Sequence, residues 1–187
     1  MNTKFTATDA ATGRVMYGGS AYRIDALEST GVRIYPGVNF STGYFKNDVH
    51  HELPPQPTPN HIFNWQTKQW EDPRTLADFK EAQWSTIKQA RSAAEYAGFT
   101  WDGSTFDSDA ISQNRITGAV ALAQMSSTFS IGWVLADNTV RTLNQSDMLQ
   151  VGAALGAHVA AQFAKGVLLR EEIEAATTKE QVEAIVW

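Results

Sequence analysis

The chain has 187 residues, of which 43% are hydrophobic, and its formal net charge at pH 7 is −5. This length suits one domain or two small ones, and a chain of this size buries enough apolar surface to fold without cross-links. Cysteine is absent, which excludes a disulfide framework, a thiol nucleophile and a thiolate metal site.

The negative charge is concentrated in the second half of the chain. Residues 98–187 carry five basic and ten acidic side chains, whereas residues 1–97 carry ten of each. A duplex-binding surface needs clustered Lys and Arg, so nucleic acid is not an expected partner. The segment after Met1 has no apolar leader, and no run approaches the roughly 20 apolar residues that cross a bilayer. We therefore expect a soluble protein without a membrane partner.

Residues 1–52 are predicted to be rich in β-strands. Apolar and β-branched residues cluster at Val15–Tyr17 and Val32–Tyr35, and glycines separate such runs. We interpret this segment as a β-rich region that docks to another protein. His50-His51-Glu52 is interpreted as a loop and not a metal site, because adjacent side chains on an extended strand point in opposite directions.

Residues 53–60 predict a linker. The sequence Leu-Pro-Pro-Gln-Pro-Thr-Pro from Leu53 to Pro59 contains four of the six prolines. Proline lacks a backbone donor and restricts φ, so this stretch is expected to be extended and semi-rigid. An alternative is a Pro-rich ligand for an aromatic groove, but a spacer requires no partner.

Residues 61–98 predict an aromatic hairpin followed by an amphipathic helix. The hairpin runs from His61 to Trp70, and the helix from Thr75 to Ala97 has apolar residues at roughly helical spacing. Such a helix is not stable alone in water, so it needs a surface to pack on, in this chain or in another. The candidate partner-binding side chains are Phe63, Trp65, Trp70, Phe79 and Trp84.

Packing within the chain is the alternative for the aromatic residues. Trp84, Trp101 and Trp133 accompany hairpins and amphipathic helices, so we interpret them mainly as core residues. Trp65 and Trp70 lie nearer the linker, and for both of them packing and partner contact are equally supported interpretations. A glycan-binding platform would require their ring faces to be exposed beside hydrogen-bonding groups.

Residues 99–187 predict an α+β domain. A second hairpin over Phe99–Phe106 precedes a helix that Ser108 is expected to cap and that ends at Met125. A third hairpin is predicted around Ala136-Asp137-Asn138, which lie between two runs of β-forming residues.

A long helix from about Gln145 to Ala175 is expected to bend or break. Its apolar residues from Met148 to Leu168 are placed on one side, and Gly152, Gly156 and Gly166 are expected to allow close approach of another backbone. Thr177 and Glu180 match a capping box for a short final helix that ends at Trp187, with Val182, Ile185 and Val186 facing inward.

Catalytic chemistry has weak support. There is no Gly-x-Ser-x-Gly nucleophile elbow and no phosphate-binding glycine loop. A glycosidase needs a pair of carboxylates, and the candidates near the second hairpin are Glu95, Asp102, Asp107 and Asp109. However, Asp102-Gly103 is more typical of a turn, and Asp107-Ser108-Asp109 is more typical of a helix start. We therefore expect a non-enzymatic protein without a cofactor or metal.

Three segments resemble a known family: Phe99–Asp109 with Arg115-Ile116, then Trp133–Val140, and the ending from Ile173 to Trp187. They are similar to a C-terminal domain of unknown function in bacteriophage and prophage tail proteins, over about residues 88–187. The proline stretch, the Trp65/Trp70 hairpin and the segment Asp72–Leu76 resemble the region that precedes this domain in tail fibre assembly proteins.

The resemblance implies a role in the tail of a bacteriophage, through contact with fibre, baseplate or hub proteins. It also implies that the protein is oligomeric during assembly. It implies a chaperone of tail fibre assembly, located in the host cytoplasm during assembly. Two alternatives are a virion structural component retained in the tail and a receptor- or glycan-binding module. The family has no catalytic motif to transfer. The expected fold is α+β, with a β-rich N-terminal segment, a spacer, and a C-terminal domain of short antiparallel hairpins packed on amphipathic helices.

Overall fold

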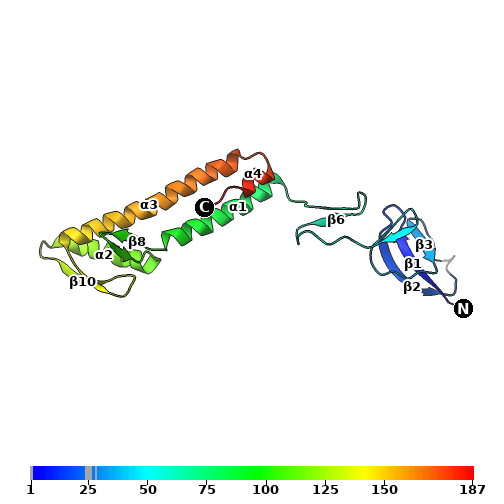
Figure 1. The fold of residues 1–187 in the computed structure, drawn as a ribbon, viewed down its shortest axis with the longest axis horizontal. Helices are drawn as coiled ribbons and strands as arrows, with labels where there is room; N and C mark the ends of the chain where they lie inside the picture. Colours follow the sequence, from blue (N-terminus) through cyan, green and yellow to red (C-terminus); the bar gives the residue numbers. More distant parts are fainter. Residues whose placement is uncertain (1, 24–26, 28) are drawn as a thin grey trace. The chain divides into compact units, whose positions relative to one another are not determined.

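The computed structural model describes residues 2–23, 27 and 29–187 (Figure 1). It confirms the expected α+β class, with 40% helix and 27% strand. The chain divides into two compact units, Met1–Arg74 and Thr75–Trp187. Residues 1, 24–26 and 28 of the predicted β-rich region lie outside the described residues.

The first unit contains a three-stranded antiparallel sheet. Strand β1 (Thr3–Asp9) lies between β2 (Val15–Ala21) and β3 (Val32–Pro36). Both faces of β1 are buried: Phe5 and Ala7 pack with Ile34, whereas the Thr6 hydroxyl donates to Val38 O and accepts from Phe40 N. Apolar Phe5 and Ala7 alternate with polar Thr6 and Thr8 along the strand, yet all four are buried, so the polar face of β1 is covered by the chain and not by solvent.

Two short hairpins complete this unit. The first joins β4 (Tyr44–Lys46) to β5 (Val49–His51), and the second joins β6 (Ile62–Asn64) to β7 (Gln69–Glu71). His50 lies in β5 and not in a loop. Its ring stacks on Phe40, 3.7 Å between centroids, and its Nε2 lies 2.8 Å from Thr42 O. The predicted loop is thus corrected to a strand that holds a packed imidazole.

The second unit is organised by one long helix, α3 (Gln145–Ala175). Helices α1 (Leu76–Glu95) and α2 (Ala110–Met125) both pack against it, and the short helix α4 (Lys179–Glu183) packs on α1. Two hairpins accompany α2 at the N-terminal half of α3 (Figure 1). They are β8 (Phe99–Trp101) with β9 (Ser104–Phe106), and β10 (Ser130–Val134) with β11 (Val140–Asn144).

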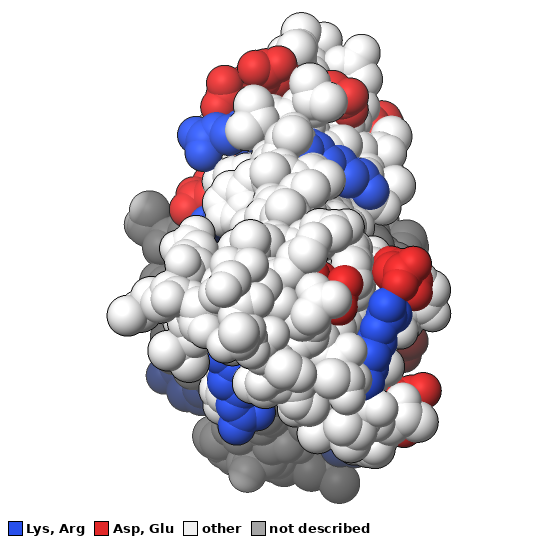
Figure 2. All heavy atoms as spheres, turned by 90° about the vertical axis from the view of Figure 1, so that its left-hand side faces the viewer, with Lys and Arg blue, Asp and Glu red and all other residues white. Residues whose placement is uncertain are grey.

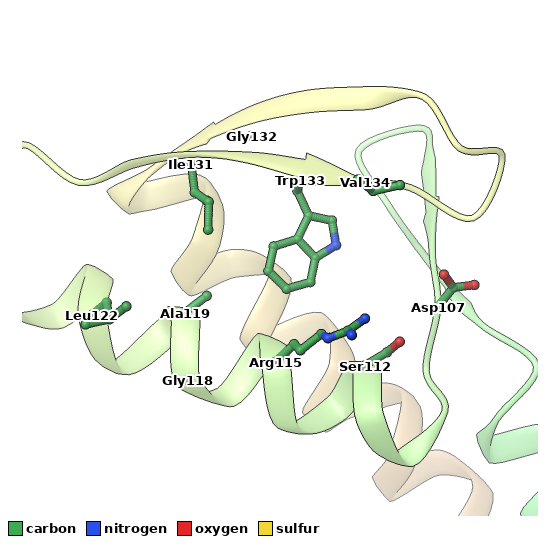
Figure 3. Close-up of a pocket in the computed structure, with 10 residues that line it drawn as sticks. All are labelled: Asp107, Ser112, Arg115, Gly118, Ala119, Leu122, Ile131, Gly132, Trp133 and Val134. Carbon is green, nitrogen blue, oxygen red and sulfur yellow. The ribbon is translucent and has the colours of Figure 1, made fainter.

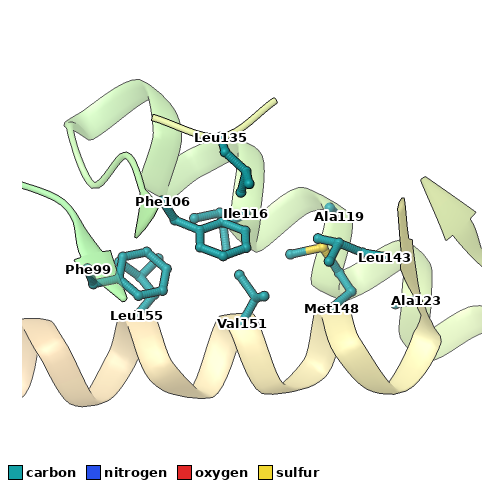
Figure 4. Close-up of a cluster of buried hydrophobic side chains, with 10 residues drawn as sticks. All are labelled: Phe99, Phe106, Ile116, Ala119, Ala123, Leu135, Leu143, Met148, Val151 and Leu155. Atoms are coloured by element: carbon teal, nitrogen blue, oxygen red, sulfur yellow. The ribbon is translucent and has the colours of Figure 1, made fainter. Parts of the chain in front are cut away.

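The main core joins α2, α3 and the two hairpins (Figure 4). Its buried residues are Phe99, Phe106, Ile116, Ala119, Ala123, Leu135, Leu143, Met148, Val151 and Leu155, with Trp101 and Trp133 packed against them. Phe79, Ala176 and Val182 form a second cluster, which anchors α4 on α1. The structure therefore confirms core packing for Trp101 and Trp133, while Val186 is 68% exposed and does not face inward.

Helix α2 approaches α3 closely at Gly152. A Cβ built at Gly152 would lie 2.6 Å from Val120 Cγ2, and one at Gly166 would lie 3.2 Å from Arg91 Cδ. Both glycines thus leave room for a neighbouring helix, but a side chain lies against each of them and not the backbone that was expected. The same expectation is wrong for Gly156, because a Cβ there would meet nothing within 4 Å.

Two predicted helix caps are displaced by one residue. Asp109, and not Ser108, caps α2, because its carboxylate accepts from the backbone N–H groups of Ile111 and Ser112. The capping box of α4 is formed by Thr178 and Gln181 in place of Thr177 and Glu180. In both places the residue before the true cap, Ser108 or Thr177, is also a favoured capping type, so residue type alone does not identify the cap.

Helix α3 is continuous and does not break. Met148, Val151 and Leu155 are buried as expected, but Phe163, Val167 and Leu168 are 46%, 56% and 61% exposed. Within the described part of the chain, α3 is the one helix that is long and apolar enough to cross a membrane by length and composition. Core helices of soluble proteins satisfy the same criterion, so this finding is weak evidence for a membrane.

Candidate functional site

A groove of about 540 Å³ lies between α2 and the hairpin β10–β11 (Figure 3). From β10, Ile131 and Trp133 point down toward the helix, and Gly118 and Ala119 of α2 form the opposite wall. The volume falls in the range of small ligand sites, and the wall is mainly apolar with an aromatic side chain inside it. We refer to this cavity as the α2 groove.

Small residues keep the α2 groove open. A Cβ built at Gly118 would meet nothing within 4 Å, and one at Gly132 would meet only Val140 Cγ1 at 3.4 Å. Leu122 and Val134, which also line the groove, are 58% and 57% exposed. The groove can therefore accept an apolar group against its wall without displacing the core beneath it.

One end of the groove is polar. Asp107, Ser112 and Arg115 line it, and Arg115 lies below the Trp133 ring in Figure 3. Among the described residues, Arg115 makes no ion pair, whereas Arg141 pairs with Asp102 and lies over the Trp101 ring. Arg115 thus offers a guanidinium for an anionic group, since Arg binds carboxylates in a bidentate manner.

Fixed anions border this region. Hydrogen bonds from the Ser112 hydroxyl and from the backbone of Ser112 and Ile111 hold the pKa of Asp109 below its ordinary value of 3.8. The Thr139 hydroxyl and N–H similarly lower the pKa of Asp137 in the β10–β11 turn. An Asp with the ordinary pKa is already ionised at neutral pH, and these hydrogen bonds extend the charged form of both carboxylates to lower pH.

The surface around the groove is largely uncharged. Figure 2 faces this end of the second unit, and residues other than Lys, Arg, Asp and Glu fill most of it. The exposed apolar side chains of α2 and of the β10–β11 hairpin are Ile111, Leu122, Met125, Val134 and Val140. Several exposed apolar side chains beside a groove are typical of a protein interaction site.

Three of the five predicted partner-binding residues lie together in the first unit. Phe63 is buried between two indoles, with ring centroids 4.9 Å from Trp65 and 5.3 Å from Trp70. Trp70 Nε1 donates to Pro54 O at 2.9 Å, which ties the proline stretch to the hairpin, and Arg14 lies 4.8 Å over the Trp65 ring. A partner role for these residues stays a prediction.

Trp65 lines two cavities of the first unit, of about 410 and 470 Å³. The smaller one is polar and contains Lys68, whose ammonium donates to Thr12 O and Trp65 O. Burial lowers the pKa of Lys68, partly offset by the charge of Asp9. These donors are therefore used within the chain, and one of them connects the β6–β7 turn to the turn that contains Thr12.

The other two predicted residues lie in the second unit. Phe79 is buried against Ala176 and Val182, so its ring packs inside the chain. Trp84 is half-buried and lines a small cavity of about 230 Å³, where the Arg170 guanidinium lies 5.0 Å over its ring. The five residues therefore do not form one surface.

The α2 groove was not among the sites predicted from sequence. Trp133 was assigned to the core, and Arg115 entered only through the family resemblance. The available signal was the combination of Gly118 on α2 with Gly132 next to Trp133, since two glycines on facing elements leave space beside an aromatic ring. No group of three or more His, Asp or Glu residues that would hold a metal was found in the described ranges.

Comparison with known proteins identifies the second unit. A family model described as "Domain of unknown function (DUF4376)" matches residues 78–186. The chain belongs to this family. The DUF4376 match begins inside α1 and includes the whole α2 groove and all of α3. No curated protein and no solved structure matches the chain.

Proposed function

We propose that this DUF4376 protein is a non-enzymatic component of bacteriophage tail assembly that acts by binding other tail proteins. The α2 groove carries the proposal: it combines an apolar wall with the guanidinium of Arg115, which makes no ion pair among the described residues, on a largely uncharged surface. The resemblance of the segments around Arg115 and Trp133 to tail proteins supports the tail context. A chaperone of tail fibre assembly, acting in the host cytoplasm, is the role that we favour.

The expected ligand of the groove is a polypeptide segment of a fibre or other tail protein. An apolar side chain would lie against Trp133 and Ile131, while a neighbouring carboxylate would bind Arg115. Burial of one large apolar side chain contributes about 1.5–3 kcal/mol. A charge-assisted hydrogen bond to Arg115 would fix the orientation of the segment.

The direct test is binding of the full chain to the purified fibre. Gly118→Leu places a side chain in the open groove and should abolish binding, while Thr117→Leu, on the exposed neighbouring position of α2, should leave it unchanged. Both variants should keep wild-type circular dichroism. Equal binding by the two variants would remove the groove from the interface.

The alternative roles are separated by mass spectrometry of purified infectious particles. Absence from particles together with abundance in lysates supports a chaperone. A fixed ratio to a known tail component would instead make the protein a virion structural part. Failure to co-purify with any tail protein in either sample would contradict the proposed function.

A further inference from the structure

One side of β10 is an open sheet edge. Within the described part of the chain, β10 pairs as a strand only with β11, so its other side has no strand partner. The strand residues that line the α2 groove all belong to β10, which shows that the groove follows this open side. An open edge presents backbone N–H and C=O groups that can pair with a further strand.

The register of the hairpin determines which backbone groups face the open side. The Leu135 N–H donates to Thr139 O at 2.9 Å, so these two residues form a hydrogen-bonded pair. Hydrogen-bonded and non-hydrogen-bonded pairs alternate along an antiparallel ladder. The N–H and C=O groups of Ser130, Gly132 and Val134 therefore point away from β11.

The chain itself pairs with this edge at the next outward position. The Ala136 N–H donates to Thr105 O of β9 at 3.0 Å, which agrees with the direction derived from the register. The edge remains available at the three outward residues Ser130, Gly132 and Val134. None of them is charged or a proline, which are the residue types that commonly protect an edge from pairing.

We propose that the α2 groove binds its ligand as an added β-strand that runs antiparallel to β10. The proposal rests on the proposed function, because it takes the ligand to be a polypeptide, and it adds the backbone conformation and the side-chain order of that ligand. Gly132 forms a hydrogen-bonded pair with one ligand residue, which we call the central residue. Antiparallel pairing is the more stable and the more common arrangement of two strands.

This pairing directs two ligand side chains into the groove. The residues before and after the central residue lie opposite Trp133 and Ile131, whose side chains point toward α2 (Figure 3). Opposite residues of two strands place their side chains on the same face, and in non-hydrogen-bonded pairs their Cα atoms are only about 4.5 Å apart. The central side chain points to the other face, where Gly132 has no side chain to obstruct it.

The two ends of the groove determine the order of the two ligand side chains. Strand β10 runs from an apolar end, at Ile131 and Leu122, to a polar end, at Trp133 and Arg115 (Figure 3). An antiparallel ligand runs the other way, so its first groove residue lies near Arg115. Among the described residues Arg115 makes no ion pair, which favours a carboxylate there. The expected order is an acidic residue, any residue, and a large apolar residue.

The length of the groove fits two such side chains. Arg115 and Leu122 are seven residues apart on α2, which corresponds to about 10 Å along the helix. Two alternate residues of a strand are about 7 Å apart. Between the two ends, a Cβ built at Gly118 would meet nothing within 4 Å, so the helix does not obstruct the ligand.

The first test is binding of a synthetic peptide, acetyl-Thr-Thr-Glu-Val-Leu-Thr-Thr-amide, to the full chain, followed by NMR titration. Its central valine has the expected neighbours, and threonine and valine favour an extended backbone. The wild type should bind this peptide about tenfold more tightly than the peptide in which Glu and Leu are exchanged, because the exchange separates the carboxylate from Arg115.

N-methylated peptides test the backbone pairing separately from the side chains. A methyl group on the nitrogen of the central valine removes the donor to Gly132 O and should abolish binding. The same methyl group on the nitrogen of the leucine lies on the side away from β10 and should leave the affinity unchanged. The two peptides have the same composition and the same side chains.

Matched proline substitutions test the same contact in the protein. Val134→Pro removes an outward N–H of β10, whereas Val140→Pro, at the directly opposite residue, removes an outward N–H on the other edge of the hairpin. Only Val134→Pro should weaken peptide binding. Both variants should keep the wild-type circular dichroism, because proline is tolerated on an edge strand where its nitrogen faces solvent.

Several results would overturn the inference. Equal affinities of the two N-methylated peptides would exclude pairing with β10, and tighter binding of the exchanged peptide would exclude the antiparallel direction. No peptide binding, together with fibre binding that is lost in Gly118→Leu, would reject strand addition and retain the proposed function. Peptide binding as expected, without binding to any tail protein, would retain strand addition and reject the tail role. A wild type that dimerises without peptide, while Val134→Pro stays monomeric, would assign the edge to a second copy of the chain.

Discussion

Ser108 and Asp109 are adjacent, but their side chains have different roles. The Ser108 hydroxyl is fully buried, accepts from Gly98 N at 2.9 Å and donates to Glu95 O, where α1 ends. Asp109 caps α2 from the surface. A serine next to a helix start is usually read as its cap, and only the tertiary contact with Glu95 shows that this one connects two elements.

Ser108→Ala is expected to lower the free energy of unfolding by about 2 kcal/mol. The substitution leaves the Gly98 N–H without its acceptor in a buried site, and an unsatisfied buried group costs about 1–3 kcal/mol. Urea denaturation followed by circular dichroism measures the change. Ser85→Ala, at an exposed position of α1, should change stability by less than about 0.5 kcal/mol. Equal changes in the free energy of unfolding for the two variants would show that the buried Ser108 hydroxyl contributes no more to stability than an exposed one.

The Asp109→Asn variant is expected to lose less stability than the wild type when the pH is lowered. Asp109 has a lowered pKa in the folded state, so its contribution is present above the unfolded pKa and is lost as pH falls through the folded pKa, below 3.8. Asparagine still caps the helix but does not titrate in this range. Thermal melts at pH 7 and near pH 3 should show a smaller difference for the variant. If the variant and the wild type showed the same difference in melting temperature between the two pH values, other carboxylates would be responsible for the loss of stability in acid.

The elements of the second unit were largely predictable. The helix expected over Thr75–Ala97 is observed as α1, and the hairpin around Ala136-Asp137-Asn138 is observed as β10–β11. Asp102-Gly103 forms the expected turn, with φ of 47° and 71°. These features depend on local periodicity and turn chemistry, which the sequence displays directly.

The environment of each helix face was less predictable. Phe163, Val167 and Leu168 continue the apolar pattern of Met148 and Val151, yet they lie exposed. Periodicity indicates which residues are apolar, but it does not indicate whether a partner element is present at each turn. For the same reason the sequence offered no signal for the α2 groove beyond the glycines Gly118 and Gly132, because the groove depends on the contact between β10 and α2.

Gly152 and Gly156 provide a matched test of helix packing. Gly152→Ala should destabilise the chain by about 1–2 kcal/mol, because its Cβ would lie 2.6 Å from Val120 Cγ2 and push α2 from α3. Gly156→Ala should stabilise it by about 0.5–1 kcal/mol, since alanine is the better helix former and nothing lies within 4 Å. Urea denaturation of both variants and of the wild type measures these changes. Effects of the same sign would contradict the close approach at Gly152.

At the scale of the molecule, the DUF4376 match and the second compact unit nearly coincide. The unit begins at Thr75, whose side chain caps α1 in a box with Asp78, and the match begins at residue 78. The main core and the cluster at Phe79 both lie inside this unit. The predicted segment 61–98 therefore extends across the division between the two units.

A fragment of residues 75–187 is expected to fold by itself. It contains the complete α1 cap and both hydrophobic clusters, so no core residue named for this unit is removed. Circular dichroism should show the helix content of the full chain's second unit and a cooperative thermal transition. A fragment that is unfolded, or that melts without cooperativity, would show that the first unit is required for its stability.

The α2 groove links ligand binding to the stability of the second unit. Its two walls come from α2 and β10, and both elements rest on the main core through Ala119, Leu143 and Met148. A ligand that binds only the assembled groove stabilises the folded state, and the gain grows with the ligand concentration. The melting temperature of the chain would therefore report which tail polypeptides enter the groove, without any label on either protein.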